Sequence, residues 1–376
     1  MTPLTTPIEM LRPAIVRFGH RQIDGLQAAL TATGVRRVLV VCDAFNATRV
    51  DALKLAATPT VFGIVEPEPD ALNLAALVET ARRVRPDVII GFGGGSSMDS
   101  AKLAAVLLDS TQTIYDIEGK ERTPARRCML IQVPTTSGTG SEVGTRALIT
   151  DPQTLNKIAV ESRHMMADMA IVDPGLTVSV PPMVTAATGI DALAHCVEAF
   201  TSKKAHPLID AYAIQGIELV GRYLRRAVEN GDDIEARSGL SIASFYGGVC
   251  LGPVNTTGGH AVSYPLGTRH KIAHGAANAL IFPHMLAFNA PAAPAKTAQV
   301  GAALGLSETA DEARLSAQAF AFCRDTGLKM SLAEYHVPRE DLGRMADEAF
   351  GIRRLLDNNP RDISRDQILT IYESAY

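Results

Sequence analysis

The sequence lacks three features that mark other classes of protein: long apolar runs, an excess of basic residues, and paired cysteines. No apolar stretch approaches the length of a membrane-spanning helix, and Met1–Thr6 lacks the basic start and apolar core of a secretion signal. With 36 Lys and Arg against 40 Asp and Glu, the net charge is −4, so there is no basic surface to attract nucleic acid. We therefore expect neither a membrane nor a nucleic acid as partner.

The five cysteines are odd in number and form no C-x-x-C pair. This usage is typical of reduced thiols in the cytoplasm rather than of a disulfide framework. The 376 residues, 47% of them hydrophobic and 20% charged, are enough for two domains with filled cores. These totals predict a cytoplasmic, two-domain globular enzyme.

The first half of the chain alternates short apolar runs with helical stretches. The apolar runs predict strands at Arg36–Cys42, Thr60–Val65, Asp87–Gly91 and Met129–Val133, and the intervening patterns predict helices at Ala47–Ala57 and Leu72–Val84. Strands that alternate with helices form a parallel sheet with right-handed crossovers. Ligands of such sheets bind beyond the carboxyl ends of the strands.

A glycine-rich turn lies at one of these strand ends. The segment Gly91-Phe92-Gly93-Gly94-Gly95-Ser96 follows a predicted strand and opens a helix that we expect to begin near Met98. Glycines let the backbone approach a pyrophosphate, and a helix N-terminus offers free N–H groups. The turn departs from the dinucleotide pattern G-x-G-x-x-G at Ser96. A glycine-rich turn between a strand and a helix is purely structural about as often as it binds a nucleotide.

Asp43 ends an earlier strand and is placed to accept a hydrogen bond from the adenosine ribose. A carboxylate there would repel a 2′-phosphate, so we expect NAD(H) to be preferred over NADP(H). A second loop, Pro134–Glu142, follows strand Met129–Val133 and is dense in hydroxyl residues and glycine. It suits hydrogen bonding to a sugar, phosphate or amide, although a polar surface loop is the plainer interpretation.

The second half contains a metal-ligand pattern. Ile190 through Phe200 contains no Pro or Gly and is expected to be helical, so Asp191 and His195 fall one turn apart on the same face. Alone, D-x-x-x-H is more often an ordinary helix with one acid and one histidine. Downstream, His260 and His274 add two imidazoles in glycine-flanked segments. One carboxylate and three imidazoles form a four-ligand set for a divalent first-row metal.

With both loops and these ligands, the sequence resembles the iron-containing (group III) alcohol dehydrogenase family over essentially the whole chain. The matching motifs are Gly93–Lys102, Pro134–Glu142, Ala170–Pro174, Ala186–His195, His274–Ala279, Pro283-His284 and Asn359–Arg361. The resemblance implies an α/β nucleotide-binding domain with a Rossmann-like parallel sheet over residues 1–181. An all-α metal-binding and catalytic domain would follow over residues 182–376, in a dehydroquinate synthase-like architecture with the cofactor in the cleft between the two.

The resemblance also implies roles for individual residues. Gly94, Gly95 and Ser96 would hold the pyrophosphate of NAD, with Asp99 supporting that loop. Thr135, Thr136 and Lys157 would line the ribose and nicotinamide region. The metal ligands would be Asp191, His195, His260 and His274, and the catalytic residues His260, Tyr264 and His274.

The expected activity is that of an NAD-dependent, iron-type alcohol dehydrogenase acting on a small alcohol or aldehyde. The metal, Fe(II) or Zn(II), would polarise the substrate oxygen while the nicotinamide takes or gives the hydride. Members of the family are commonly homodimers or larger homo-oligomers.

Three positions depart from the family pattern or bear on the substrate. Tyr264 stands where many relatives have a histidine, and Glu68 stands where they often have Asn between two prolines. Arg146 is at a position that the family turns toward the substrate, where it would select an anionic group. The alternative is a surface arginine paired with Glu142 or Asp151.

Two other functions remain open from the sequence. One is reduction of an anionic oxo-acid or semialdehyde, as in maleylacetate reductases, which often lack the full ligand set present here. The other is a lyase similar to dehydroquinate synthase, which would need a basic pocket and a ligand set built around Glu.

Overall fold

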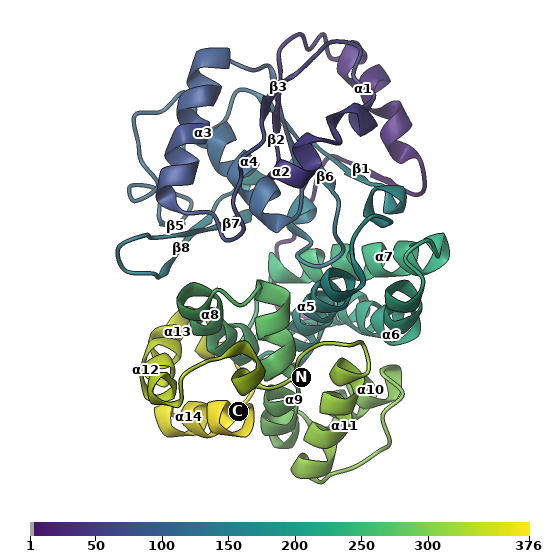
Figure 1. The fold of residues 1–376 in the computed structure, drawn as a ribbon, viewed down its shortest axis with the longest axis vertical. Coiled ribbons are helices and arrows are strands. Elements are labelled where there is room, and N and C mark those ends of the chain that lie inside the picture. The colour runs from purple at the N-terminus through teal and green to yellow at the C-terminus, as the bar shows by residue number, and fades with distance from the viewer. Residues whose placement is uncertain (1–3) are drawn as a thin grey trace. The chain divides into compact units, whose positions relative to one another are not determined.

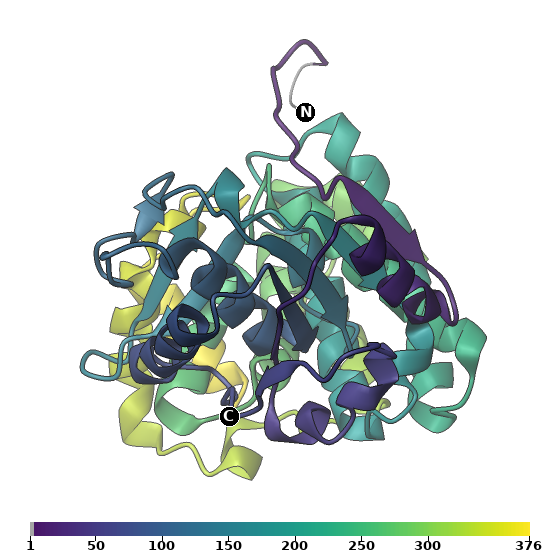
Figure 2. The same cartoon turned by 90° about the horizontal axis from the view of Figure 1, so that it is seen from above.

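The computed structural model describes residues 4–376 (Figures 1 and 2). The chain divides into two compact units, which we describe separately. A helical unit contains residues 4–10, 137–139 and 180–376, and a sheet-containing unit contains residues 11–136 and 140–179. A division of function at residues 181 and 182 stays a prediction.

The sheet-containing unit is built on six parallel strands in the order β1-β9-β6-β4-β2-β3, with β1 at one edge (Figure 2). The predicted strands all lie in this sheet, whereas β1 and β9 have no counterpart among them. The bounds are β1 Ile15–Phe18, β2 Val38–Val41, β3 Thr60–Phe62, β4 Val88–Gly93, β6 Met129–Pro134 and β9 Met169–Val172.

Both faces of this sheet are buried, which is why its central strands are apolar without alternation. Val40 and Ile90 point to one face and pack with Leu26 of α1 (Leu26–Ala32). Their neighbours Leu39 and Ile89 point to the other face, against α3 (Ala71–Val84) and α4 (Gly95–Leu107). The predicted parallel sheet with helices is therefore confirmed.

Asp43 sets the start of the helix after β2. Its side chain accepts from the backbone N–H of Asn46, so α2 begins at once and spans Ala44–Ala47. A 3₁₀ turn, Val50–Leu53, follows and ends at Lys54, whose φ of 52° is left-handed. The single helix predicted for Ala47–Ala57 is therefore wrong, because this cap and this left-handed residue shorten it.

The glycine-rich turn itself forms the start of α4. Gly94 is the N-cap, so the helix begins at Gly95 rather than near Met98. Gly93, at the end of β4, has a φ of 153°, a conformation that side chains rarely adopt. The turn thus needs glycine for its backbone geometry, and the first helical N–H groups lie at the carboxyl ends of the strands.

A small second sheet, in the order β5-β8-β7, belongs to the same unit and had no counterpart in the sequence prediction. β7 and β8 pair antiparallel, and β5 pairs parallel with β8. The bounds are β5 Gly119–Lys120, β7 Arg146–Thr150 and β8 Lys157–Glu161.

The helical unit carries ten α-helices among its described residues. Its central helix, α5, packs against α6, α7 and α9 (Figure 1). The bounds are α5 Pro182–Thr201, α6 Pro207–Glu229, α7 Ile234–Leu251, α8 Gly258–His270, α9 His274–Asn289, α10 Pro294–Ala303, α11 Glu312–Arg324, α12 Leu342–Gly351, α13 Arg353–Leu356 and α14 Arg365–Ser374.

The helix predicted from Ile190 through Phe200 is the second half of α5. Gly189 lies inside α5 without interrupting the helix. A Cβ at that position would lie 2.4 Å from Cδ1 of Leu224 on α6. The glycine therefore permits a close approach of two helices, which outweighs its low helix propensity. The approach buries α5, and the side chain of Asp191 is 2% exposed.

Candidate active site

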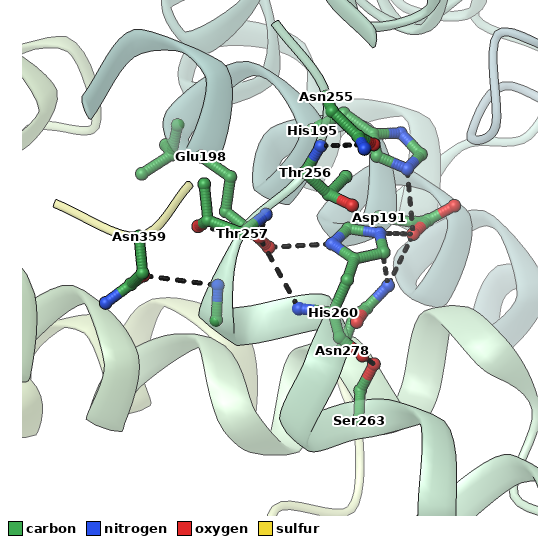
Figure 3. A network of polar contacts seen from close by, with 12 residues as sticks. Asp191, His195, Glu198, Asn255, Thr256, Thr257, His260, Ser263, Asn278 and Asn359 are labelled. Atoms are coloured by element: carbon green, nitrogen blue, oxygen red, sulfur yellow. Dashed lines mark hydrogen bonds and ion pairs between the residues drawn. The ribbon is translucent and has the colours of Figure 1, made fainter. Parts of the chain in front are cut away.

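Three helices bring the predicted metal ligands together. Asp191 and His195 lie one turn apart on α5, His260 is in the first turn of α8, and His274 begins α9. One ligand atom from each of the four lies within 4.8 Å of every other. The sequence prediction that these side chains converge is therefore met by the geometry, and Figure 3 shows Asp191, His195 and His260 turned toward one another.

The distances fit a single metal ion. The imidazole Nε2 atoms of His195, His260 and His274 lie 3.8, 3.6 and 3.4 Å from Oδ1 of Asp191. Four ligands at ordinary metal-to-ligand bond lengths in a tetrahedral site would be separated by about 3.4 Å. The donor set of one carboxylate and three imidazoles suits Fe(II) or Zn(II).

The ring orientations of two of the histidines are fixed by partners on the far side of each ring. Nδ1 of His260 lies 2.7 Å from Oε1 of Glu198, and Nδ1 of His195 lies 3.3 Å from the carbonyl oxygen of Gly138. If each Nδ1–H donates to its oxygen, each Nε2 is left unprotonated and faces the cluster. Oε2 of Glu198 accepts from the backbone N–H and the hydroxyl of Thr257, so the carboxylate is itself held (Figure 3).

Glu198 was not among the residues predicted from the sequence. It lies seven residues after Asp191 and three after His195, on the same face of α5, and this spacing is the signal that could have identified it. Asn278 was also missed, although it follows His274 by one helical turn. Its Nδ2 donates to Oδ1 of Asp191 over 2.6 Å and lies 3.1 Å from Nε2 of His260.

Burial and charge set the protonation of the cluster. Burial lowers the pKa of His195 to about 4, so its imidazole is neutral and available as a ligand at neutral pH. Burial opposes ionisation of Asp191, yet the three neighbouring imidazoles hold its pKa well below its usual range. Burial likewise opposes ionisation of Glu198, but His260 and Thr257 lower its pKa. The cluster therefore keeps two carboxylates ionised inside the protein, as a cation site requires.

Tyr264 lies beside the cluster, one turn after His260 on α8. Its ring centroid is 6.0 Å from that of His274 and 6.4 Å from that of His260. The side chain of His274 is 28% exposed, whereas that of Asp191 is 2% exposed. The accessible side of the cluster is therefore the side of His274 and Tyr264.

The predicted nucleotide-binding residues gather at the carboxyl ends of β2, β4 and β6. The backbone N–H of Thr135 donates to the carbonyl of Gly93 over 3.0 Å. A Cβ placed on Gly94 would lie 3.4 Å from Oγ1 of Thr136, and one on Gly93 would lie 3.2 Å from Oδ2 of Asp43. Gly95 and Ser96 form the adjoining first turn of α4, so the structure places these predicted residues at one edge of the sheet.

Asp99 makes contacts that differ from the prediction. Oδ1 of Asp99 accepts from the hydroxyl of Ser141 and from Nζ of Lys102, and Oδ2 accepts from the backbone N–H of Leu148 over 3.0 Å. These bonds tie α4 to β7 and to the segment after the Thr-rich loop rather than to the glycine-rich turn. The reason is position: Asp99 lies a turn into α4, beyond the loop that it was expected to support.

Lys157 and Glu68 are ion-pair partners. Nζ of Lys157 forms an ion pair with Glu68, the residue that replaces the usual Asn between two prolines, and donates to Oγ1 of Thr150 over 2.9 Å. Glu68 has a left-handed φ of 54°. The glutamate that replaces the usual Asn is thus neutralised by Lys157, the residue predicted to line the ribose and nicotinamide region.

Arg146 has a partner that the sequence did not suggest. It lies opposite Glu161 in the β7–β8 ladder, and its Nε and Nη2 donate to Oε2 of Glu161 over 3.0 and 2.6 Å. The register of the two strands opposes these two side chains, so Arg146 forms a cross-strand pair with Glu161.

Comparison with known proteins follows the same two-part division. The sequence profile of iron-containing alcohol dehydrogenases matches residues 13–174, and the profile of the C-terminal part of that family matches residues 185–376. The chain belongs to the iron-containing alcohol dehydrogenase family. It is an oxidoreductase of that family, which uses NAD and iron, so the predicted class, cofactors and fold are confirmed at that level.

Relatives cover nearly the whole chain. A long-chain-alcohol dehydrogenase of Geobacillus thermodenitrificans is 35% identical over 97% of this chain and 95% of its own. A sulfoacetaldehyde reductase of Bilophila wadsworthia is 39% identical over 82% of each. The structure of a sulfoacetaldehyde reductase of Bifidobacterium kashiwanohense in complex with NAD⁺ superposes with a TM-score of 0.87 at 30% identity, covering 98% of this chain and 99% of that one.

Family membership favours the oxidoreductase over the dehydroquinate synthase-like lyase, whose ligand set would be built around Glu. Small alcohols and aldehydes are substrates consistent with this family. Within residues 4–376, no helix has both the length and the apolar character needed to cross a membrane.

Proposed function

We propose that Asp191, His195, His260 and His274 hold the catalytic metal of an NAD(H)-dependent alcohol dehydrogenase, and that the substrate oxygen approaches from the side of His274. The observation that carries this assignment is the convergence of four ligand atoms within 4.8 Å, with Nδ1 of His260 anchored by Glu198. A divalent metal bound there polarises a carbonyl or stabilises an alkoxide.

The protein residues would orient the metal ligands, exclude water and move the proton. Glu198 and the carbonyl of Gly138 orient the rings of His260 and His195 so that their Nε2 atoms are aimed at the cluster. The ring of Tyr264 lies beside the partly exposed His274, and we assign its hydroxyl the proton transfer to or from the substrate oxygen. Bound NAD(H) would supply or accept the hydride that the substrate carbon gains or loses.

We further propose residues 1–181 as the dinucleotide-binding domain and residues 182–376 as the metal-binding and catalytic domain. The pyrophosphate would lie over Gly94, Gly95 and Ser96, and the adenosine ribose at Asp43. The nicotinamide end would be near Thr135, Thr136 and Lys157, with Asp99 fixing α4. The enzyme would be a cytoplasmic homodimer or larger homo-oligomer.

The test is a single substitution at the metal cluster. We expect His260→Ala to lower kcat/KM by at least a thousandfold and to reduce bound metal, because it removes a ligand whose other nitrogen is anchored. NADH oxidation with a short aldehyde, metal content by mass spectrometry, and circular dichroism measure the three outcomes. Near-normal turnover by folded, metal-free His260→Ala protein would contradict the assignment.

A second candidate substrate class is favoured by the relatives. A protein 39% identical to this chain is a sulfoacetaldehyde reductase, and so is the NAD⁺ complex described above. Reduction of a short aldehyde with an anionic group is the corresponding proposal for this chain. Arg146 is one candidate for the anion contact, although its guanidinium is already engaged by Glu161.

A further inference from the structure

Arg354 is a charged residue beside the candidate active site for which neither the sequence motifs nor the metal cluster provides a role. It lies in α13, which packs against α8, the helix that carries His260 and Tyr264 (Figure 1). Cζ of Arg354 is 5.7 Å from the centroid of the Tyr264 ring. The same ring lies 6.0 Å from the ring of His274, so one aromatic side chain contacts both the guanidinium and a metal ligand.

The charge of Arg354 is uncompensated. Within residues 4–376, its guanidinium forms no ion pair and no hydrogen bond, and its side chain is exposed. The adjacent Arg353, by contrast, is paired with Asp357, and Arg146 is paired with Glu161. An unpaired guanidinium keeps all of its N–H donors available in a planar fork that matches a carboxylate or sulfonate.

Arg354 is linked to the accessible side of the cluster through Tyr264, whose ring lies beside His274. The side chains of Asp191 and His260 are each 2% exposed, whereas that of His274, which lies beside Tyr264, is 28% exposed. A short substrate whose oxygen reaches the cluster past His274 would carry its far end along Tyr264. A negative group at that end would meet Arg354.

We infer that Arg354 binds the anionic group of the substrate and thereby selects short aldehydes that carry a sulfonate or carboxylate. This inference rests on the proposed function and specifies its substrate class. It assigns the selection to a guanidinium with no competing partner, rather than to Arg146. The ring of Tyr264 fixes the approach of the guanidinium through cation–π contact while leaving its donors unused.

The experiment compares two substrates of similar shape, sulfoacetaldehyde and the uncharged methylsulfonylacetaldehyde, with NADH and metal-loaded enzyme. The measured quantity is the ratio of their kcat/KM values. We expect the unaltered enzyme to favour the sulfonate, and Arg354→Met to lower the ratio by about 10- to 100-fold, mainly through a higher KM for the sulfonate. Arg354→Lys should restore part of the ratio, because the charge remains but the fork is lost.

Arg353→Met is the matched control, since it removes the neighbouring arginine from the same short helix. We expect it to leave the ratio unchanged. Arg146→Ala should lower the ratio less than Arg354→Met does. A separate binding measurement uses ethanesulfonate, which cannot be reduced, and calorimetric titration should show weaker binding by about 10- to 100-fold in Arg354→Met.

The outcomes separate this inference from the proposed function. If the unaltered enzyme reduces both aldehydes equally, or if Arg354→Met keeps the ratio and the ethanesulfonate affinity, the role of Arg354 is overturned while the dehydrogenase assignment stands. If neither aldehyde is reduced by metal-loaded enzyme, the proposed substrate class fails, and the ethanesulfonate titration still decides whether Arg354 binds anions. The inference would also be overturned if Arg146→Ala, and not Arg354→Met, abolished the preference for the sulfonate.

Discussion

Among the individual residues, Glu198 is the one on which the orientation of the metal site depends most directly. Its two carboxylate oxygens accept from His260 and from Thr257, and its side chain is buried. A buried carboxylate without partners would be costly, so these hydrogen bonds stabilise ionised Glu198 and fix the ring orientation of His260. The metal-facing nitrogen of His260 is thus controlled by a residue that does not itself face the cluster.

We predict that Glu198→Gln lowers the affinity for Fe(II) or Zn(II) by about 10- to 100-fold. Glutamine can still accept from His260, but it lacks the charge and cannot accept twice from Thr257. Competition with a chromogenic chelator measures the affinity, and activity at saturating metal measures what remains. Glu235→Gln is the control, because Glu235 is an exposed partner of Arg226 on the surface of the helical unit. Equal affinities in both variants would contradict the role of Glu198.

Among the elements, α4 is held to the segment that follows the Thr-rich loop by a buried polar network. Lys102 is fully buried and donates to Asp99, to Ser141 and to the carbonyl of Arg146. Glu142 lies in the same segment and is 2% exposed, and its Oε2 has no hydrogen-bond partner within residues 4–376. Burial raises the pKa of Glu142 to about 7.

This pKa predicts a pH-dependent stability. Because the folded state holds the Glu142 proton more tightly than the unfolded state, stability falls as the pH rises from 4.5, the ordinary pKa of a glutamate, to about 7. Glu142→Gln should therefore match the unaltered enzyme near pH 5 and exceed it at pH 8, by at most roughly 3 kcal/mol. Urea unfolding at pH 5, 6.5 and 8 tests this.

Glu79→Gln is a suitable control for that series, because Glu79 is exposed on α3. It should shift none of the three unfolding midpoints by much. A Glu142→Gln variant whose stability parallels that of the unaltered enzyme at all three pH values would show that Glu142 is already neutral or compensated.

In the molecule as a whole, the two compact units carry different candidate ligand sites. The four metal ligands all belong to the helical unit, while Asp43, Gly94 and Thr136 belong to the sheet-containing unit. A ligand stabilises the structure that binds it, by RT ln(1 + [L]/Kd). Metal should therefore stabilise chiefly the helical unit.

We predict that removing the metal lowers the thermal midpoint of the helical unit by about 5–10 °C relative to enzyme in metal at a hundredfold excess over Kd. Differential scanning calorimetry with and without a chelator measures the shift, and added Fe(II) or Zn(II) should reverse it. His260→Ala protein should show little response. An equal gain of the His260→Ala protein on metal addition would place the binding site elsewhere.

The sequence by itself determined the features that depend on short-range order. Strand and helix periodicity identified the strands β2, β3, β4 and β6, and i, i+4 spacing placed Asp191 beside His195. Glycine at positions 93–95 marked the turn that precedes α4. These features follow from backbone sterics and local hydrogen bonding, which a few neighbouring residues fix.

Only the tertiary structure decided which distant side chains became partners. Lys157 meets Glu68, Arg146 meets Glu161, and Arg354 meets Tyr264. None of these contacts follows from local spacing, because each depends on strand register or on which helices the buried apolar faces bring together. The motifs therefore identified the candidate metal-binding and nucleotide-binding residues, whereas tertiary packing determined which other residues contact and orient them.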